Sequence, residues 1–219
     1  MSAVIVALDF DNAADAVAVV DRLGDAAPSY KVGLELLTSA GPAVVNTLVG
    51  KGKEVFLDLK LFEIPASVAA AVRAAGRLGV SMVTVHATGG PAVLDAAVGA
   101  AADVPGLRVL ALTVVTSLGD ADLAAVGVDA TVGEQTLRLA RLAHRAGCHG
   151  VVAAARSAPS LRAVLGPDPL VVTPGVATPA EAVAAVGAGA SHVVIGRAVA
   201  KAGDPLAALT AVRNALAVR

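Results

Sequence analysis

The chain has 219 residues and a formal net charge of −1, and hydrophobic residues make up 56% of it while aromatic residues make up only 2%. This length suits one domain built around an aliphatic core better than two domains. The absence of a basic run gives no electrostatic footprint for nucleic acid, and no apolar stretch is long and charge-free enough to span a bilayer.

Eight short apolar runs alternate with Ala-rich amphipathic segments along the chain. Continuous apolar runs separated by helical patterns indicate a parallel sheet that is covered on both faces. In chain order, the predicted strands are Val4 to Phe10, Ser29 to Val32, Val55 to Lys60, Met82 to Ala87, Val109 to Val115, Gly150 to Ala154, Leu170 to Thr173 and His192 to Gly196.

Eight strand and helix units in one domain predict an α/β fold, a single-domain (β/α)8 TIM barrel over residues 1–219. A doubly wound open sheet is the alternative. The first strand is not followed by the G-x-G-x-x-G motif that is typical of such sheets. No linker, low-complexity tract or shift in composition indicates a second domain.

The third predicted strand carries the most informative motif, in which Asp58, Lys60 and Glu63 follow the apolar residues at its carboxyl end. Because side chains alternate along a strand, we expect Asp58 and Lys60 to share one face, roughly 6 to 7 Å apart along the backbone. Opposite charges on a buried strand are costly unless they are paired or used in chemistry. A structural ion pair is the simpler interpretation of this motif. Further ionisable residues at the ends of other strands would favour a catalytic role instead.

Polar residues and glycines also gather at the ends of the other predicted strands. In a barrel of this kind, catalytic groups lie at the carboxyl ends of the strands and in the loops that follow. We therefore predict one active site at this end of the barrel. Its further candidate residues are Asp9, Lys31, Ser117, Pro174, Gly175, Gly196 and Arg197. His86 also lies at a strand end, where a structural hydrogen bond within the barrel mouth is the simpler interpretation.

These motifs resemble those of the orotidine 5′-phosphate decarboxylase family, over the stretch from Val4 to about Leu216. The family signature is D-x-K-x-x-D, and Glu63 stands at its last position. The motifs that carry the resemblance are Ala7-Leu8-Asp9-Phe10, Lys31-Val32-Gly33-Leu34-Glu35-Leu36, Phe56-Leu57-Asp58-Leu59-Lys60, Val85-His86-Ala87 with Gly89-Gly90, Leu112 through Ser117, Val172-Thr173-Pro174-Gly175 and Val194-Ile195-Gly196-Arg197.

The resemblance implies decarboxylation of orotidine 5′-phosphate to UMP and CO2, in pyrimidine biosynthesis, with no metal and no organic cofactor. Stabilisation of the C6 carbanion would then be electrostatic. Lys60 would lie beside C6 and protonate it as general acid. Asp58 would face the departing carboxylate.

The resemblance also assigns the residues around this pair. Asp9 and Lys31 would bind the ribose hydroxyls and complete an alternating chain of charges. Glu63 would reach the active site of a neighbouring subunit, which implies a homodimer with shared sites. Ser117 would recognise the amide edge of the pyrimidine.

The phosphate group is expected at the loops after strands 7 and 8. Backbone amides and a short helix N-terminus favour an anion there. The candidates are Pro174, Gly175, Gly196 and Arg197, since glycine permits close approach of the backbone and arginine offers a bidentate donor.

The chain departs from the family pattern in three places. The longer mobile loop that closes over the phosphate after strand 7 is missing, which should weaken binding and turnover. Glu63 replaces an Asp of the same charge. Phe62 stands where the family more often has His, and Ala66-Ser67 where it has Asn-Thr, although the Ser67 hydroxyl can still donate to the substrate.

Two alternatives remain open at this point. Related barrels that share D-x-K-x-x-D act on ketose phosphates with Mg2+. They have an acid at strand 2, where this chain has Lys31, which argues against a metal. The second alternative is a catalytically weak barrel that binds a nucleotide, and the missing loop after strand 7 is the reason to consider it.

The start of the chain and its single cysteine bear on the compartment. Met1-Ser2 leads directly into an apolar strand, without a positively charged region or a cleavage site, so we expect a cytoplasmic protein. Cys148 is the only cysteine, which excludes an internal disulfide and a cysteine-based metal site.

Overall fold

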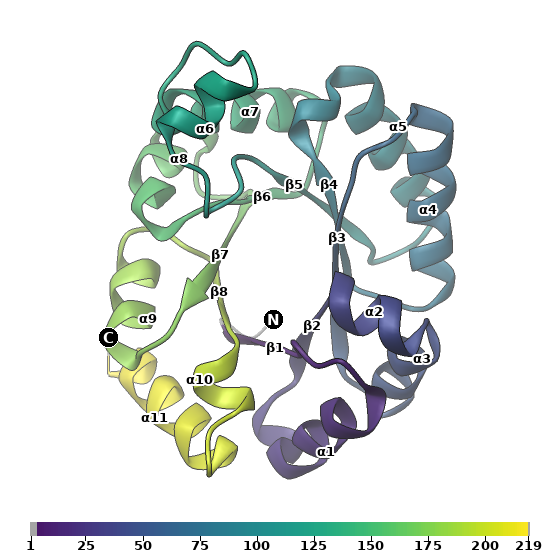
Figure 1. The fold of residues 1–219 in the computed structure, drawn as a ribbon, viewed down its shortest axis with the longest axis vertical. Coiled ribbons are helices and arrows are strands. Elements are labelled where there is room, and N and C mark those ends of the chain that lie inside the picture. The colour runs from purple at the N-terminus through teal and green to yellow at the C-terminus, as the bar shows by residue number, and fades with distance from the viewer. Residues whose placement is uncertain (1–3, 219) are drawn as a thin grey trace.

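The computed structural model describes residues 4–218 as a closed barrel of parallel strands in the order β1 to β8 (Figure 1). The helices form a ring around the strands. This arrangement confirms the predicted (β/α)8 barrel and excludes the open sheet. Met1 and Ser2, on which the expectation about compartment rests, lie outside the described residues.

The strands agree with the prediction in number and order, and they differ at their ends. β1, β5 and β6 are shorter than predicted at their carboxyl ends, whereas β7 continues past Thr173 and so includes Pro174 and Gly175. The strands are β1 (Val4–Ala7), β2 (Ser29–Gly33), β3 (Glu54–Leu61), β4 (Met82–His86), β5 (Arg108–Leu112), β6 (Gly150–Val152), β7 (Leu170–Val176) and β8 (His192–Ile195).

Helices follow every strand and many begin at recognisable caps. The side chain of Asn12 accepts the Asp15 amide at the start of α1, and Thr131 with Glu134 forms a capping box at α7. The helices are α1 (Ala13–Leu23), α2 (Leu34–Ala40), α3 (Ala43–Gly50), α4 (Pro65–Arg77), α5 (Pro91–Ala102), α6 (Asp120–Ala125), α7 (Val132–Arg145), α8 (Ala158–Leu165), α9 (Pro179–Gly187), α10 (Arg197–Ala200) and α11 (Pro205–Ala217), with short 3-10 turns at Gly24–Ala26, Ala87–Gly89 and Ala155–Ser157.

Two buried apolar clusters stabilise the barrel. The larger one lies between the sheet and the helices, and it is built mainly from Val, Leu and Ala. The smaller one fills the barrel interior with residues from all but the second strand: Ile5, Ala7, Phe56, Met82, Leu110, Leu112, Val152, Val172 and Val194. Because this interior is packed, a small molecule can enter only at the ends of the barrel.

Register shifts interrupt two strands near their carboxyl ends. The pairing of β3 with β4 shifts between Leu57 and Leu61, and that of β7 with β8 shifts between Thr173 and Val176. Such bulges often re-aim side chains next to active sites.

Across the described residues, no helix is long and apolar enough to cross a membrane.

Candidate active site

Lys60 and Asp58 form an ion pair at the carboxyl end of β3. Lys60 Nζ lies 2.8 Å from Asp58 Oδ2, and the two side chains are 33% and 12% exposed. The pairing was predicted, but strand alternation is not its cause. Lys60 lies in the β3 bulge with φ of 51°, the left-handed region. The bulge, and not a regular pleat, therefore sets the direction of the Lys60 side chain.

Thr84 on β4 connects the backbone of Lys60 to the carboxylate of Asp58. Its hydroxyl donates to Asp58 Oδ1 at 2.9 Å and accepts the Lys60 amide at 2.8 Å, and the residue is fully buried. Thr84 was not among the residues predicted from the sequence. A polar residue in the apolar run Met82–His86 was the available signal, since it shares a face with His86 two positions later.

Asp9 and Lys31 form a second ion pair, with Lys31 Nζ 3.0 Å from Asp9 Oδ1. Two glycines, Gly33 and Gly196, leave room for this ion pair. A Cβ at Gly33 would lie 3.0 Å from Lys31 Nζ, and one at Gly196 would lie 3.3 Å from Asp9 Oδ2. These glycines are therefore needed for the space they leave open.

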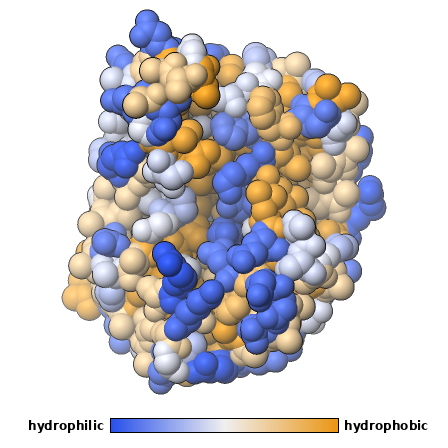
Figure 2. All heavy atoms as spheres, in the orientation of Figure 1, coloured by the Kyte–Doolittle hydropathy of each residue, from blue (hydrophilic) through white to orange (hydrophobic). Residues whose placement is uncertain are grey.

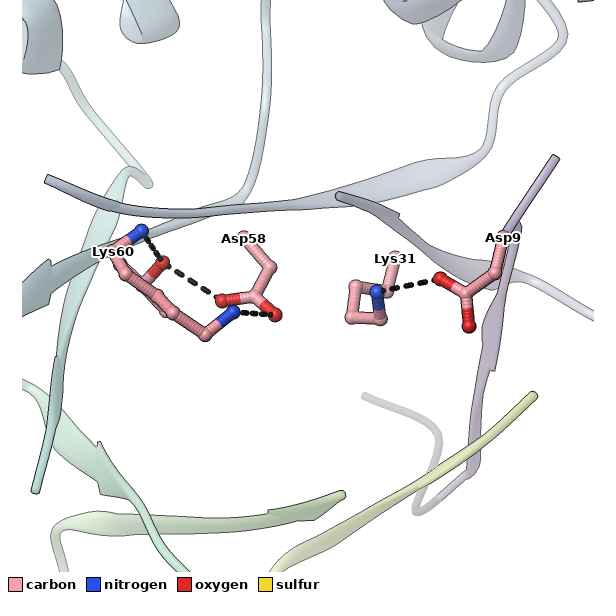
Figure 3. A network of polar contacts seen from close by, with 5 residues as sticks. Asp9, Lys31, Asp58 and Lys60 are labelled. Carbon is pink, nitrogen blue, oxygen red and sulfur yellow. Dashed lines mark hydrogen bonds and ion pairs between the residues drawn. The ribbon is translucent and has the colours of Figure 1, made fainter. Parts of the chain in front are cut away.

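The four charged residues stand in a row across the barrel mouth, in the order Lys60, Asp58, Lys31 and Asp9 (Figure 3). Hydrogen bonds join the residues within each pair. Charges of opposite sign thus alternate along the row, as predicted. Seen from the same side, a band of hydrophilic residues extends from the centre of the face into its lower part, with hydrophobic residues on either side of it (Figure 2).

A cavity of about 380 Å³ opens at this row of charges. Its volume is within the range of roughly 300 to 1,000 Å³ that is usual for small-molecule sites. The cavity also has apolar walls, which lower the local dielectric and strengthen electrostatic interactions. The lining residues are Ala7, Asp9, Lys31, Asp58, Lys60, Leu112, Val115, Thr116, Val152, Pro174, Gly175, Val176, Ala177, Val194, Gly196, Arg197 and Ala198.

The predicted phosphate residues Pro174, Gly175, Gly196 and Arg197 all line this cavity. Gly175 has φ of 82°, a conformation that favours glycine, and Gly196 caps the N-terminus of α10. Arg197 is exposed. These four residues come from β7 and the end of β8, and β7 lies across the closed barrel from β3, which carries Lys60.

The connection from β7 to α9 consists of two residues, Ala177 and Thr178. The Ala177 amide donates to Glu181 Oε2 at 2.7 Å, and Thr178 caps the helix by accepting the Glu181 amide. These two amides are occupied within the chain. The anion is therefore expected at the β8 side, at Gly196 and Arg197, more than at the start of α9.

Three predicted site residues, and also His86, lie outside the cavity of the single chain. Glu63, Ser67 and Ser117 are exposed and do not line it. The Glu63 carboxylate accepts the amide of its neighbour Ile64. In place of Ser117, the preceding residue Thr116 faces the cavity.

His86 lies at the end of β4, beside the ion pair of β3. Burial lowers its pKa below the ordinary value, and the positive charge of Lys60 lowers it further. Its Nδ1 lies 2.6 Å from the Thr88 hydroxyl, and its ring is 6.0 Å from that of Phe62. His86 is therefore neutral near pH 7 and held in place by its neighbours.

The fold and the site together define a TIM-barrel enzyme of the type that places paired acids and lysines at the carboxyl ends of its strands. Residues 2–212 match the model of the orotidine 5′-phosphate decarboxylase / HUMPS family. The chain belongs to this family.

Named relatives support the membership. Orotidine 5′-phosphate decarboxylase of Laribacter hongkongensis is 45% identical over 100% of this chain and 95% of its own, and that of Shewanella sediminis is 42% identical over 98% and 97%. The crystal structure of orotidine 5′-phosphate decarboxylase from Lactobacillus acidophilus superposes with a TM-score of 0.88 at 36% identity, and covers 97% of this chain and 98% of its own.

The length of one alignment shows that this chain lacks residues that a relative has. The alignment to the Laribacter protein extends over 233 positions, whereas this chain has 219 residues, so at least 14 positions hold a residue of the relative and none of this chain. The two-residue connection between β7 and α9 offers a place for such a deletion.

Proposed function

We propose that this protein decarboxylates orotidine 5′-phosphate to UMP and CO2, without a metal or an organic cofactor, as a step of pyrimidine biosynthesis. The observation that carries the proposal is the row of two ion pairs, Lys60 with Asp58 and Lys31 with Asp9, at the mouth of a cavity large enough for a small molecule. Relatives at 41–45% identity that bear the name of this enzyme support it.

The Lys60 and Asp58 pair provides the chemistry. The bond between C6 and the carboxylate carbon breaks, CO2 leaves, and the electron pair remains at C6. The Lys60 ammonium stabilises this charge and then transfers a proton from Nζ to C6. Asp58, held 2.8 Å from that ammonium, repels the substrate carboxylate and favours its departure. The apolar walls, which include Leu112 and Val152, exclude water around the developing charge.

The rest of the cavity binds the nucleotide. Asp9 and Lys31 bind the ribose hydroxyls as acceptor and donor. Arg197 and the backbone at Gly196 bind the phosphate, at the far end of the same cavity. The pyrimidine then lies over Lys60, and Ser117 and Ser67 contact it only if their exposed segments move toward the cavity or meet it in an assembly.

The magnesium-dependent ketose-phosphate reaction is less well supported. At strand 2, the position of a metal-binding acid is taken by Lys31, whose ammonium is bound to Asp9. Among residues 4–218, no three His, Cys, Asp or Glu side chains cluster in a way that would hold a metal ion. An ammonium at this place repels a divalent cation.

The direct test is to incubate the purified protein with orotidine 5′-phosphate in EDTA, to follow the loss of the substrate's ultraviolet absorbance, and to identify UMP by chromatography. Turnover in EDTA supports the proposal. Absence of turnover, together with activity on a ketose phosphate in Mg2+, would establish the alternative. Binding of UMP without turnover would indicate a nucleotide-binding barrel.

We also propose a homodimer in the cytoplasm, with Glu63 contributing to the partner's active site. Large apolar side chains are exposed on both sides of this residue in the chain, Phe62 at 65% and Ile64 at 62%, and Leu34 after the neighbouring strand is 56% exposed. They follow β2 and β3, next to the cavity mouth. A patch of this kind marks a protein interface, and a two-fold contact here would bring Glu63 toward the other subunit.

A further inference from the structure

We infer that Thr84 is a positioning residue for catalysis, which aims the Asp58 carboxylate at the substrate and holds the bulged backbone of Lys60. This inference rests on the proposed decarboxylation. Thr84 is fully buried on β4 and does not line the cavity, so it acts through the two residues to which it is bonded.

The directions of the two hydrogen bonds follow from the chemistry of their partners. A carboxylate only accepts and a backbone amide only donates, so the Thr84 hydroxyl donates to Asp58 Oδ1 and accepts from the Lys60 amide. The Thr84 hydroxyl is thereby a donor to one member of the ion pair and an acceptor from the other. No other side chain is bonded to both of them among the described residues.

Bonds from two sides hold the Asp58 carboxylate. Thr84 holds Oδ1 at 2.9 Å, and Lys60 Nζ holds Oδ2 at 2.8 Å. An unrestrained carboxylate would rotate away from a second negative charge. With Oδ1 anchored, Asp58 stays in place when the substrate carboxylate arrives, so the repulsion acts on the substrate. The anchor therefore matters most for the bond-breaking step.

The second bond acts on the backbone of Lys60. Lys60 has φ of 51°, a left-handed conformation that is unfavourable for a residue with a side chain. The shift between β3 and β4 takes its amide out of the regular strand pairing, and the Thr84 hydroxyl accepts this amide in place of a backbone carbonyl. The bulge directs the ammonium toward C6, so Thr84 supports the placement of the proton donor as well.

The test compares Thr84→Val, which keeps the shape of the side chain and removes its hydroxyl, with Thr84→Ser, which keeps the hydroxyl. Thr113→Val on β5 is a matched control, because Thr113 is equally buried and its hydroxyl donates to the Val152 carbonyl. For each variant, kcat and KM for orotidine 5′-phosphate, the inhibition constant of UMP and the thermal midpoint are measured.

We expect kcat of Thr84→Val to fall about 10- to 100-fold, the loss of one buried hydrogen bond to a charged group. KM and the UMP inhibition constant should stay within about threefold, since UMP lacks the carboxylate that Asp58 repels. Thr84→Ser should retain kcat within about threefold. Thr113→Val should lower the thermal midpoint without lowering kcat.

Three results would overturn the inference: an unchanged kcat in Thr84→Val, an equal loss of kcat in Thr113→Val, or an equal loss of UMP binding and kcat. If Thr84→Val does not fold, the pair Thr84→Ser and Thr84→Ala differs only by the hydroxyl and decides in its place. An inactive wild-type protein would instead refute the proposed function, which separates the two failures.

Discussion

Lys60 Nζ lies 2.8 Å from Asp58 Oδ2 although the backbone of Lys60 has left-handed torsion angles. Among the described residues, Lys60 is the only one other than glycine with a positive φ. Strained backbone of this kind persists where the surroundings over-determine it, and it gathers at functional sites. The left-handed backbone of Lys60 thus lowers the stability of the fold, while its side chain forms the ion pair. Substitutions of Lys60 can therefore affect activity and stability differently.

Lys60→Ala and Lys60→Gly should both lose decarboxylation, with kcat falling at least about 1,000-fold, because the proton donor and the charge beside C6 are both removed. Lys60→Gly should be the more stable of the two by about 1 kcal/mol, since glycine adopts the left-handed region without strain. Product formation and urea unfolding measure the two effects. Normal turnover in either variant would exclude Lys60 as the proton donor.

Lys51→Ala provides the control for this pair. Lys51 is exposed and pairs with Asp21 at a distance of 2.7 Å, on the segment between α3 and β3, away from the cavity. Exposed pairs contribute only about 0 to 1 kcal/mol to stability. Turnover should therefore be unchanged in this variant.

Mixed dimers of Lys60→Ala and Glu63→Ala should recover part of the activity that each parent lacks. If Glu63 serves the partner's site, one of the two sites in a heterodimer contains both an intact Lys60 and an intact Glu63. Mixing at equal concentrations should then restore up to about a quarter of the wild-type rate, since about half of the dimers are mixed. A heterodimer seen by native mass spectrometry without any recovered activity would contradict the shared site.

Arg197→Ala should raise KM for orotidine 5′-phosphate by about 10- to 100-fold, because a charge-assisted bond to the phosphate contributes roughly 1.5 to 3 kcal/mol. Turnover of the phosphate-free nucleoside should change little, as it has no such bond to lose. Steady-state kinetics with both substrates makes the comparison. Equal effects on the two would place the anion site elsewhere.

Gly33→Ala should weaken substrate binding with little loss of stability. The added Cβ would lie 3.0 Å from Lys31 Nζ, the end of a flexible side chain that can move away. The φ of −103° at this position suits alanine. KM should rise while the unfolding midpoint stays nearly constant. Gly99→Ala on α5 is the control, because nothing lies within 4 Å of its added Cβ, and it should gain about 0.5 to 1 kcal/mol without a change in KM.

His192 should make the protein less stable in mild acid. Burial, and then the positive charge of Arg108, lowers its pKa from 6.5 to about 4. Between these two values the unfolded chain binds a proton that the folded protein does not, so stability falls as the pH falls from 7 toward 4. At pH 5 this loss amounts to roughly 2 kcal/mol.

Urea unfolding of the wild type and His192→Gln at pH 7.5 and pH 5 measures this effect. The wild type should lose more stability than the variant between the two values. Equal losses would show that His192 is not the group responsible. The residue begins β8, at the end of the barrel away from the cavity, so kcat should be insensitive to the change.

The order of elements along the chain was enough to predict the barrel, because eight apolar runs separated by amphipathic segments leave few other ways to bury both faces of a parallel sheet. The sequence likewise placed Asp9, Lys31, Asp58, Lys60 and Arg197 at strand ends, and all five line one cavity. A residue that ends a strand must lie at the same edge of the sheet as the other strand ends, whatever the details of packing.

Tertiary structure decided the features that depend on register between strands. The bulge at Lys60, the bonds of Thr84 and the space left by Gly33 and Gly196 arise where two strands that are distant in sequence meet. Periodicity within one strand carries no information about a shift relative to its neighbour. Hence the sequence predicted that Asp58 and Lys60 lie on the same face of the strand, and only the packed barrel determined which atoms bring them into contact.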